Sequence, residues 1–117
     1  MTITLKIAKN PIWKHKNGDK RVMKRLRKLE GVNVNCVAEI RSFTNVWNKY
    51  NISVCLNHLQ INHFKIDHMW VKSNDLYRNF LLYDQIRFQA KVYCYRKKNG
   101  KLGFTLCNLK EIKLIEV

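Results

Sequence analysis

Basic and aromatic residues are interleaved in two polar stretches of the sequence, residues 43–50 and 95–101. This mixture suits one kind of chemistry, because aromatic rings stack on bases at about 1–3 kcal/mol each while cations hold a phosphate backbone without reading its sequence. The side chains that we single out in and beside the first stretch are Arg41, Trp47, Lys49 and Tyr50. Those in the second stretch are Tyr95, Arg96, Lys97, Lys98 and Lys101. Together they predict a surface that binds nucleic acid.

A structural role competes with this interpretation, because aromatic residues favour strands and fill the core of small β proteins. We expect Phe43, Phe64 and Phe88 in the core. Trp47 and Tyr50 lie in a polar stretch, which favours exposure. Trp13 stands beside Lys14, His15 and Lys16, where it could stack on a base or pack as an anchor.

The net charge of the chain is the second sign of a polyanionic partner. Its 117 residues include 23 Lys and Arg against 8 Asp and Glu, a formal charge of +15. Such a charge repels itself, and neutralising phosphates releases counterions, which drives most non-specific affinity for DNA or RNA. A merely solvated basic surface is the alternative. An anionic membrane is less favoured, because no segment is apolar over the length that spans a bilayer.

The positive charge is concentrated near the N-terminus, since residues 1–31 hold ten Lys and Arg against Asp19 and Glu30, a net +8. An apolar stripe of Val22, Met23, Leu26 and Leu29 predicts a short helix there, with a turn and cap at 17–19 and Gly31 as its stop. The cations on its other face are Lys20, Arg21, Lys24, Arg25, Arg27 and Lys28. This face either contacts phosphates or is simply solvated.

From Val32 onward the apolar period changes to two, which predicts strands. The expected strands are residues 32–40, 52–61, 64–71 and 84–95, followed by one broken or two short strands over 102–107 and 110–117. Ser73 is the expected N-cap of a helix over 74–82 with Leu76, Phe80 and also Tyr77 and Leu81 on one face, and Asn99-Gly100 predicts a hairpin. This order is that of a mainly β, five-stranded Greek-key barrel with one short helix between its third and fourth strands.

With residues 66–71 (Ile-Asp-His-Met-Trp-Val) and 83–95 placed in this order, the segment 32–117 resembles OB-fold domains that bind single-stranded nucleic acid, in particular small proteins of phages and mobile elements. One departure is Tyr83-Asp84, where such domains often read Gly-Asp. The resemblance implies an OB-like barrel over 32–117 beside a basic N-terminal arm over 1–31. It also implies binding between the loops that join strands one to two and four to five.

The remaining chemistry-bearing residues give no recognisable site. Cys36, Cys55, Cys94 and Cys107 lack a Cys-x-x-Cys pair and fit free thiols in a reducing compartment. The histidines at 58, 63 and 68 recur every five residues, so on a continuous strand neighbours face opposite sides. We therefore expect no metal, no cofactor and no enzyme activity. The start of the chain lacks the apolar run of a signal peptide, which predicts a cytoplasmic protein.

These observations predict a non-catalytic protein that binds single-stranded DNA or RNA through stacking and phosphate contacts. An alternative is a phage or mobile-element accessory protein or inhibitor that binds a host nucleic-acid enzyme or nucleoprotein complex, because fold does not fix function. A third is a protein that binds folded RNA or the ribosome. The sequence leaves open DNA against RNA, single strand against duplex, and the oligomeric state.

Overall fold

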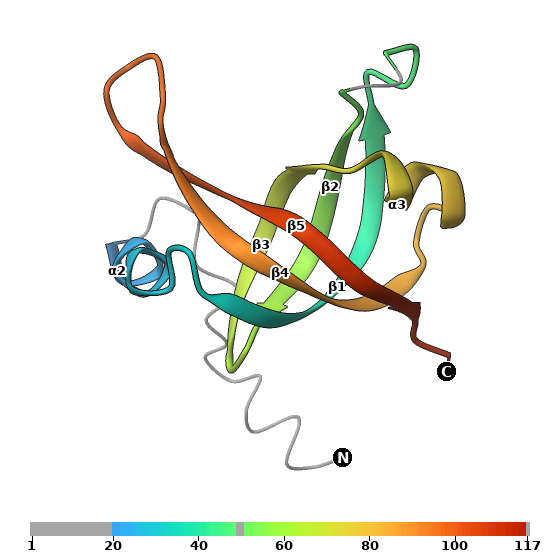
Figure 1. Cartoon of the computed structure of the whole chain (residues 1–117), viewed down its shortest axis with the longest axis horizontal. Helices are drawn as coiled ribbons and strands as arrows, with labels where there is room; N and C mark the ends of the chain where they lie inside the picture. The colour runs from blue at the N-terminus through green and yellow to red at the C-terminus, as the bar shows by residue number, and fades with distance from the viewer. Residues whose placement is uncertain (1–19, 49–50, 117) are drawn as a thin grey trace.

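A computed structural model describes residues 20–48 and 51–116 of the chain. Within these ranges the elements follow one another as α2 (Lys20–Lys28), β1 (Asn33–Thr44), β2 (Ser53–Ile61), β3 (Phe64–Lys72), α3 (Asn74–Asn79), β4 (Gln85–Arg96) and β5 (Leu102–Leu114). Figure 1 shows them in a mainly β arrangement, with a short helix on either side of the strands. The expected order of strands and helices is therefore confirmed.

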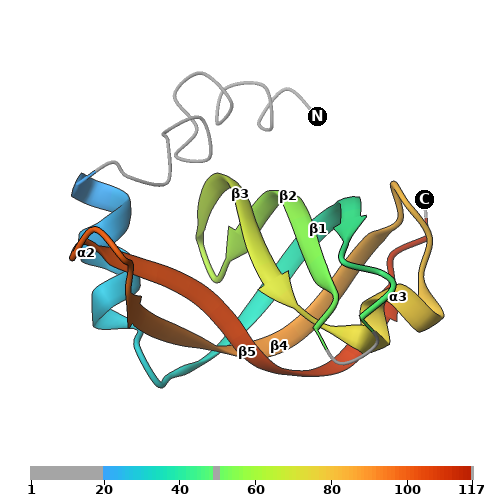
Figure 2. The ribbon, with the colours of Figure 1, turned by 90° about the horizontal axis from the view of Figure 1, so that it is seen from above.

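In the part of the chain that the structure describes, the strands form one five-stranded antiparallel sheet in the order β3-β2-β1-β4-β5. The sheet curls, as Figure 2 shows, so that its two edge strands approach each other. The Thr105 hydroxyl on β5 donates a 2.8 Å hydrogen bond to the carbonyl oxygen of Trp70 on β3. Residues 35 positions apart in sequence are thus neighbours across this seam, which we call the β3–β5 seam.

The core lies inside the curl and is made by the inward-facing half of each strand. On β4, for example, Ile86, Phe88, Ala90 and Val92 are buried and alternate with exposed or half-buried residues, as the period of two predicts. Phe64 is also buried, as expected. The prediction for Phe43 was wrong, because this side chain is only half-buried at the rim of the core. Its ring packs edge-on against the ring of Tyr77, with 5.2 Å between the ring centroids.

Irregularities let the strands curl while keeping their apolar faces inward. His58 has a φ of +49°, and the buried positions of β2 shift there from Val54 and Leu56 to Leu59 and Ile61. Two register shifts in β5 accompany positive φ at Asn108 and Glu111. Such bulges bend a strand and increase its twist. Residues 102–114 therefore form one bulged strand, which resolves the two options left by the sequence.

Helix α2 packs on the core through the predicted apolar stripe. Val22 and Leu26 are fully buried in the same cluster as the sheet residues, and Leu29 packs against it. The chain turns at Gly31, whose φ is +76° and whose N–H donates to the carbonyl oxygen of Val92 at 2.8 Å. A left-handed residue at this point favours glycine. The helix is therefore held against β4 with its charged face outward.

Helix α3 is capped as expected but is shorter than expected. The Ser73 hydroxyl accepts a 3.2 Å hydrogen bond from the Leu76 N–H, and Leu76 is fully buried. Phe80 has an extended backbone, so the helix ends at Asn79 instead of residue 82. As a result Leu81 leaves the helical face on which we placed it, and its side chain is 73% exposed.

Candidate nucleic-acid interface

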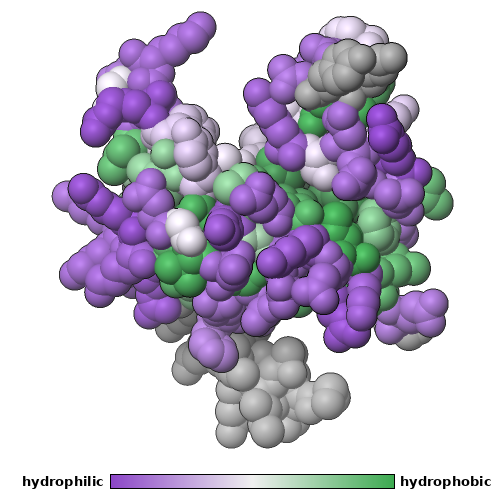
Figure 3. Space-filling model, viewed as in Figure 1, coloured by the Kyte–Doolittle hydropathy of each residue, from purple (hydrophilic) through white to green (hydrophobic). Residues whose placement is uncertain are grey.

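A groove of about 530 Å³ follows the outer side of the β3–β5 seam. Its aromatic lining is Trp70 from β3 with Tyr93 and Tyr95 from β4, whose side chains are 46%, 52% and 40% exposed. Figure 3 shows the surface hollowed between the β4–β5 hairpin and the connection from β1 to β2. Aromatic faces that remain accessible in a concave surface are suited to stacking on flat ligands.

The two tyrosines reach this groove because of strand alternation and a glycine on the neighbouring strand. Val92 is buried, so Tyr93 and Tyr95 point outward. Tyr93 is paired with Thr105, and Tyr95 with Gly103. A Cβ at position 103 would stand 2.6 Å from Cζ of Tyr95, well inside van der Waals contact. The absence of a side chain at Gly103 therefore lets the Tyr95 ring lie across β5.

Trp70 lies on the other side of the groove, on the edge strand β3. Its neighbours Met69 and Val71 are buried, so the indole points outward while the backbone is anchored in the core. The hydrogen bond from the Thr105 hydroxyl to the Trp70 carbonyl oxygen fixes the distance between β5 and β3. The core and this seam thus hold the strands that carry the groove in place.

The groove extends at both ends. Toward α2, a hollow of about 490 Å³ shares Trp70 and Tyr95 and adds Met23, Lys97 and Lys101. Toward α3, a hollow of about 320 Å³ continues past Lys72 and Asn108, which also line the central groove. Among the described residues, the lining of the central groove and of its extension toward α2 includes no carboxylate. These two parts of the surface are therefore cationic, whereas the extension toward α3 also includes the carboxylate of Asp75.

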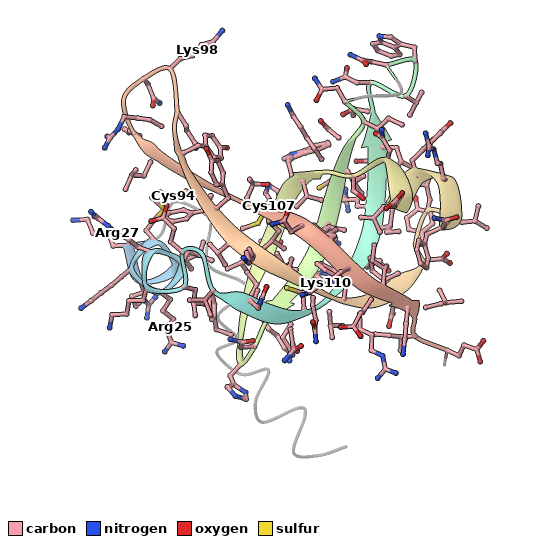
Figure 4. The ribbon with its side chains drawn as sticks, viewed as in Figure 1. Arg25, Arg27, Cys94, Lys98, Cys107 and Lys110 are labelled. Carbon is pink, nitrogen blue, oxygen red and sulfur yellow. The ribbon has the colours of Figure 1, made fainter. Side chains whose placement is uncertain are left out.

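The β4–β5 hairpin forms a firm wall at the α2 end. Backbone hydrogen bonds join the Lys97 N–H to the Lys101 oxygen at 2.8 Å and the Gly100 N–H to the Lys97 oxygen at 2.9 Å. One nitrogen of the Arg96 guanidinium donates to the Gly100 oxygen at 2.8 Å, so this arginine braces the loop. Figure 4 shows Lys98 at the tip of the hairpin, pointing away from the body of the protein.

The predicted cations of α2 are all exposed, and they divide between two sides. Lys24, Arg27 and Lys28 line a hollow of about 470 Å³ with Leu102 and Phe104, next to the groove. Arg25 lies instead over the ring of Phe64 at 5.6 Å, on the side of β3. Lys20 and Arg21 belong to the first turn of the helix. One face of α2 thus continues the cationic border of the groove.

The other predicted residues are distributed less simply. Trp47 is 83% exposed in the connection between β1 and β2, as expected, and Arg41 is exposed on β1. Trp13, Lys49 and Tyr50 lie outside the described residues. Reasoning from the sequence omitted Trp70 and Tyr93 from the binding residues. Both are outward positions of alternating strands, but only the β3–β5 seam brings them together.

Among the described residues, two buried cysteines have a pKa that departs from its ordinary value. Burial raises the pKa of Cys36 to about 12 and also raises the pKa of Cys55, where Arg41 acts in the opposite direction. Cys107 is half-buried and lines the groove. His68 contacts Asp67 at 3.0 Å, and in the described ranges no group of three His, Cys, Asp or Glu side chains is arranged to hold a metal ion.

Comparison of the chain with models of protein families, with curated proteins and with solved structures gave no match. Neither helix within residues 20–48 and 51–116 has the length and apolar character needed to cross a membrane.

Proposed function

We propose that this protein binds single-stranded nucleic acid in the groove of the β3–β5 seam, without catalysing a reaction. The observation that carries the proposal is the joint exposure of Trp70, Tyr93 and Tyr95 in a groove whose α2 end is bordered by Lys97 and Lys101. Stacking on these rings holds successive bases, and the cations hold the phosphates.

The fold that we propose for this role is an OB-like Greek-key barrel. The support is the strand order β3-β2-β1-β4-β5, the helix between β3 and β4, and the approach of the two edge strands at Thr105 and Trp70. OB-like barrels bind oligonucleotides between the loops that flank such a face. Here those loops are the β1–β2 connection, which holds Trp47, and the β4–β5 hairpin, which holds Lys98.

The exposed rings favour a single strand over a duplex. In a duplex the faces of the bases are already stacked on one another, so they are hidden from the protein, whereas unpaired bases offer a free face to each ring. Duplex DNA would contact only the cations of α2 and of the hairpin. We therefore expect weaker and more salt-sensitive binding of duplexes than of single strands.

Binding of fluorescently labelled single-stranded DNA, single-stranded RNA and duplex DNA of matched sequence, measured across a salt series, tests the proposal. Affinity for a single strand should exceed that for the duplex and should fall by a factor of ten or more between about 50 and 200 mM salt, as several phosphate contacts are screened. Equal affinity for duplex and single strand would contradict the stacking mechanism. Binding of a protein that survives nuclease and high salt, with no oligonucleotide binding, would replace it with a protein-binding role.

A further inference from the structure

Helix α2 carries positive charge on the sides that the core does not cover. Six of its nine residues are Lys or Arg, and the helix contains neither an acidic nor an aromatic side chain. All six cations are exposed, whereas Val22 and Leu26 are buried against the sheet. Cations three and four positions apart, such as Lys24 with Arg27 and Lys28, repel one another along a helix. A polyanion lying on α2 would relieve this repulsion.

The cations of α2 face in more than one direction. The α2 hollow, of about 470 Å³, opens on the side of β5 and is lined by Met23, Lys24, Arg27, Lys28, Leu102 and Phe104. Arg25 lies on the side of β3, with its guanidinium carbon 5.6 Å from the centroid of the Phe64 ring. Figure 4 shows Arg25 and Arg27 pointing in different directions from the helix. A ligand that contacts both must therefore present negative charge to two sides of α2.

Carboxylates near α2 are few in comparison with its cations. The sequence places Asp19 directly before the helix and Glu30 two residues after it, against six cations, and Asp19 lies outside the described residues. On β3, the carboxylate of Asp67 contacts the ring of His68 at 3.0 Å. Among the described residues, the lining of the α2 hollow includes no carboxylate. The charge of this surface therefore favours a ligand rich in phosphate.

The α2 hollow adjoins the groove in which we propose that a single strand lies. It shares Met23, Leu102 and Phe104 with the extension of the groove toward α2. That extension in turn shares Trp70 and Tyr95 with the central groove. Figures 1 and 2 agree in placing α2 at the same end of the molecule as the β4–β5 hairpin. A strand that leaves the rings at this end of the groove therefore passes α2.

The groove and α2 suit two different forms of nucleic acid. The groove offers exposed rings, which stack on unpaired bases. Helix α2 offers cations without rings, and these cations face in more than one direction. In a duplex the base faces are hidden and two phosphate backbones flank each groove, so phosphate contacts of this kind are the ones that a duplex offers. A single strand has only one backbone to place beside the helix.

We propose that the preferred ligand is a single strand that continues into a duplex, with unpaired bases in the groove and the first turn of the duplex against α2. The inference rests on the proposed function, because the groove must hold the single-stranded part. Lys24, Arg27 and Lys28 contact one backbone of the duplex, and Arg25 contacts the other. The protein therefore binds at junctions between single and double strands.

The test compares fluorescently labelled DNA ligands by their anisotropy with the full chain. The main ligand joins a duplex of about 12 base pairs, just over one turn, to a single-stranded tail of about 12 nucleotides in either polarity. The others are the duplex alone, the tail alone and a single strand of about 24 nucleotides, which matches the length of the main ligand. The tailed duplex should bind at least about tenfold more tightly than the longer single strand, because its second contact is intramolecular.

The outcomes separate this inference from the proposed function. Equal affinity for the tailed duplex and the longer single strand would overturn the inference, while the proposed function would stand. The absence of binding to any single strand would contradict the proposed function itself. Saturable binding of poly-glutamate at α2 that the tailed duplex does not displace would also overturn the inference, because it would assign this surface to an acidic protein.

Two variants make the result specific to α2. Replacing Lys24, Arg27 and Lys28 by glutamine should bring the affinities for the tailed duplex and the longer single strand within a factor of about two, because the phosphate contacts of the duplex are lost. Arg25→Gln should remove only part of the gain. The melting temperature should be unchanged or higher, since repulsion along the helix is reduced.

The control for these variants removes the same charge from the strands, by replacing Lys65, Lys110 and Lys113 with glutamine. These lysines do not line the groove or the α2 hollow, so the gain from the duplex should be retained. An equal loss of the gain in the control would show a general effect of net charge and would overturn the inference.

Discussion

The groove of the β3–β5 seam and the α3–β4 patch, the exposed surface of Tyr77, Leu81, Leu82 and Tyr83, both expose aromatic side chains but in different surroundings. In the groove, Trp70 and Tyr95 line a hollow on the strands whose lining also includes Lys72, Lys97 and Lys101. On the patch, Tyr83 lies on a loop whose backbone is hydrogen-bonded to Ile40 of β1, and the Asp84 carboxylate follows it directly in the chain. Exposure of a ring alone therefore does not indicate what it binds. The shape and the charge around the ring do.

The largest expected effect is on the aromatic lining of the groove. The double substitution Trp70→Ala with Tyr95→Ala removes two stacking surfaces worth about 1–3 kcal/mol each, so single-strand affinity should fall by at least about 30-fold. Fluorescence anisotropy with a labelled oligonucleotide measures the loss, and circular dichroism checks that the fold is retained.

Tyr77→Ala is the matched control for this change, because Tyr77 is 42% exposed, close to the value for Trp70, but belongs to the patch. Its oligonucleotide affinity should stay within a factor of about two, since a surface ring outside the site contributes little. An equal loss in the control and in the double variant would mean that the two regions do not differ in function.

The second effect is electrostatic. Replacing Lys97, Lys98 and Lys101 by glutamine should flatten the dependence of log K on log salt by about two, because each lost phosphate contact changes a single-strand slope by about 0.7. The slope follows from titrations at several salt concentrations. The control is the triple replacement of Lys65, Lys110 and Lys113, which carry the same charge on strands outside the groove lining. A slope that falls equally in both variants would indicate a general charge effect rather than a hairpin contact.

The sequence was sufficient for the parts of the fold that local rules determine. Alternation over residues 84–95, the Ser73 cap and the Asn99-Gly100 turn each predicted an element that is present. The predicted end of α3, residue 82, was wrong. The apolar pattern of a helical face continues to Leu81, but the backbone becomes extended at Phe80. That extension depends on hydrogen bonds between residues 81–84 and β1, which no local pattern shows.

The candidate site was only partly predictable for a related reason. The cations of the hairpin and of α2 were evident as runs of charge. Trp70 was not, because its role depends on β5 lying beside β3, a pairing between residues 35 apart in sequence. Alternation could indicate that Trp70 and Lys72 face outward, but not which strand lies next to them. Sites made at the meeting of two sheet edges need the tertiary structure.

The third effect isolates the position of one ring in the groove. In Gly103→Ala, the new Cβ meets the far end of the Tyr95 side chain, which can swing away because it is partly exposed. Stability should change by less than about 1 kcal/mol, whereas single-strand affinity should fall about 3- to 10-fold as part of one stacking contact is lost. A drop in stability without a drop in affinity would mean that Tyr95 has a structural role alone.

The smallest expected effect is a change in the rate at which cysteines are labelled when a single strand binds, which shows where the strand lies. Cys107 lines the groove and is half-buried, while Cys94 is half-buried on the inward-facing side of β4. Burial raises the pKa of Cys36 to about 12 and also raises the pKa of Cys55, so in the folded state both stay protonated and slow to react at about pH 8.

The sign of this shift also fixes its effect on stability. Because the pKa of Cys36 is higher in the folded state, its contribution is complete below the pKa of the unfolded thiol and is lost as pH rises toward 12. Labelling at about pH 8 therefore compares Cys107 with Cys94 in an intact fold. A saturating single strand should slow the labelling of Cys107 severalfold and leave Cys94 unchanged. Protection of Cys94 instead would place the bound strand at the contact between α2 and the sheet. The basic face of the helix, rather than the aromatic rings of the groove, would then determine binding.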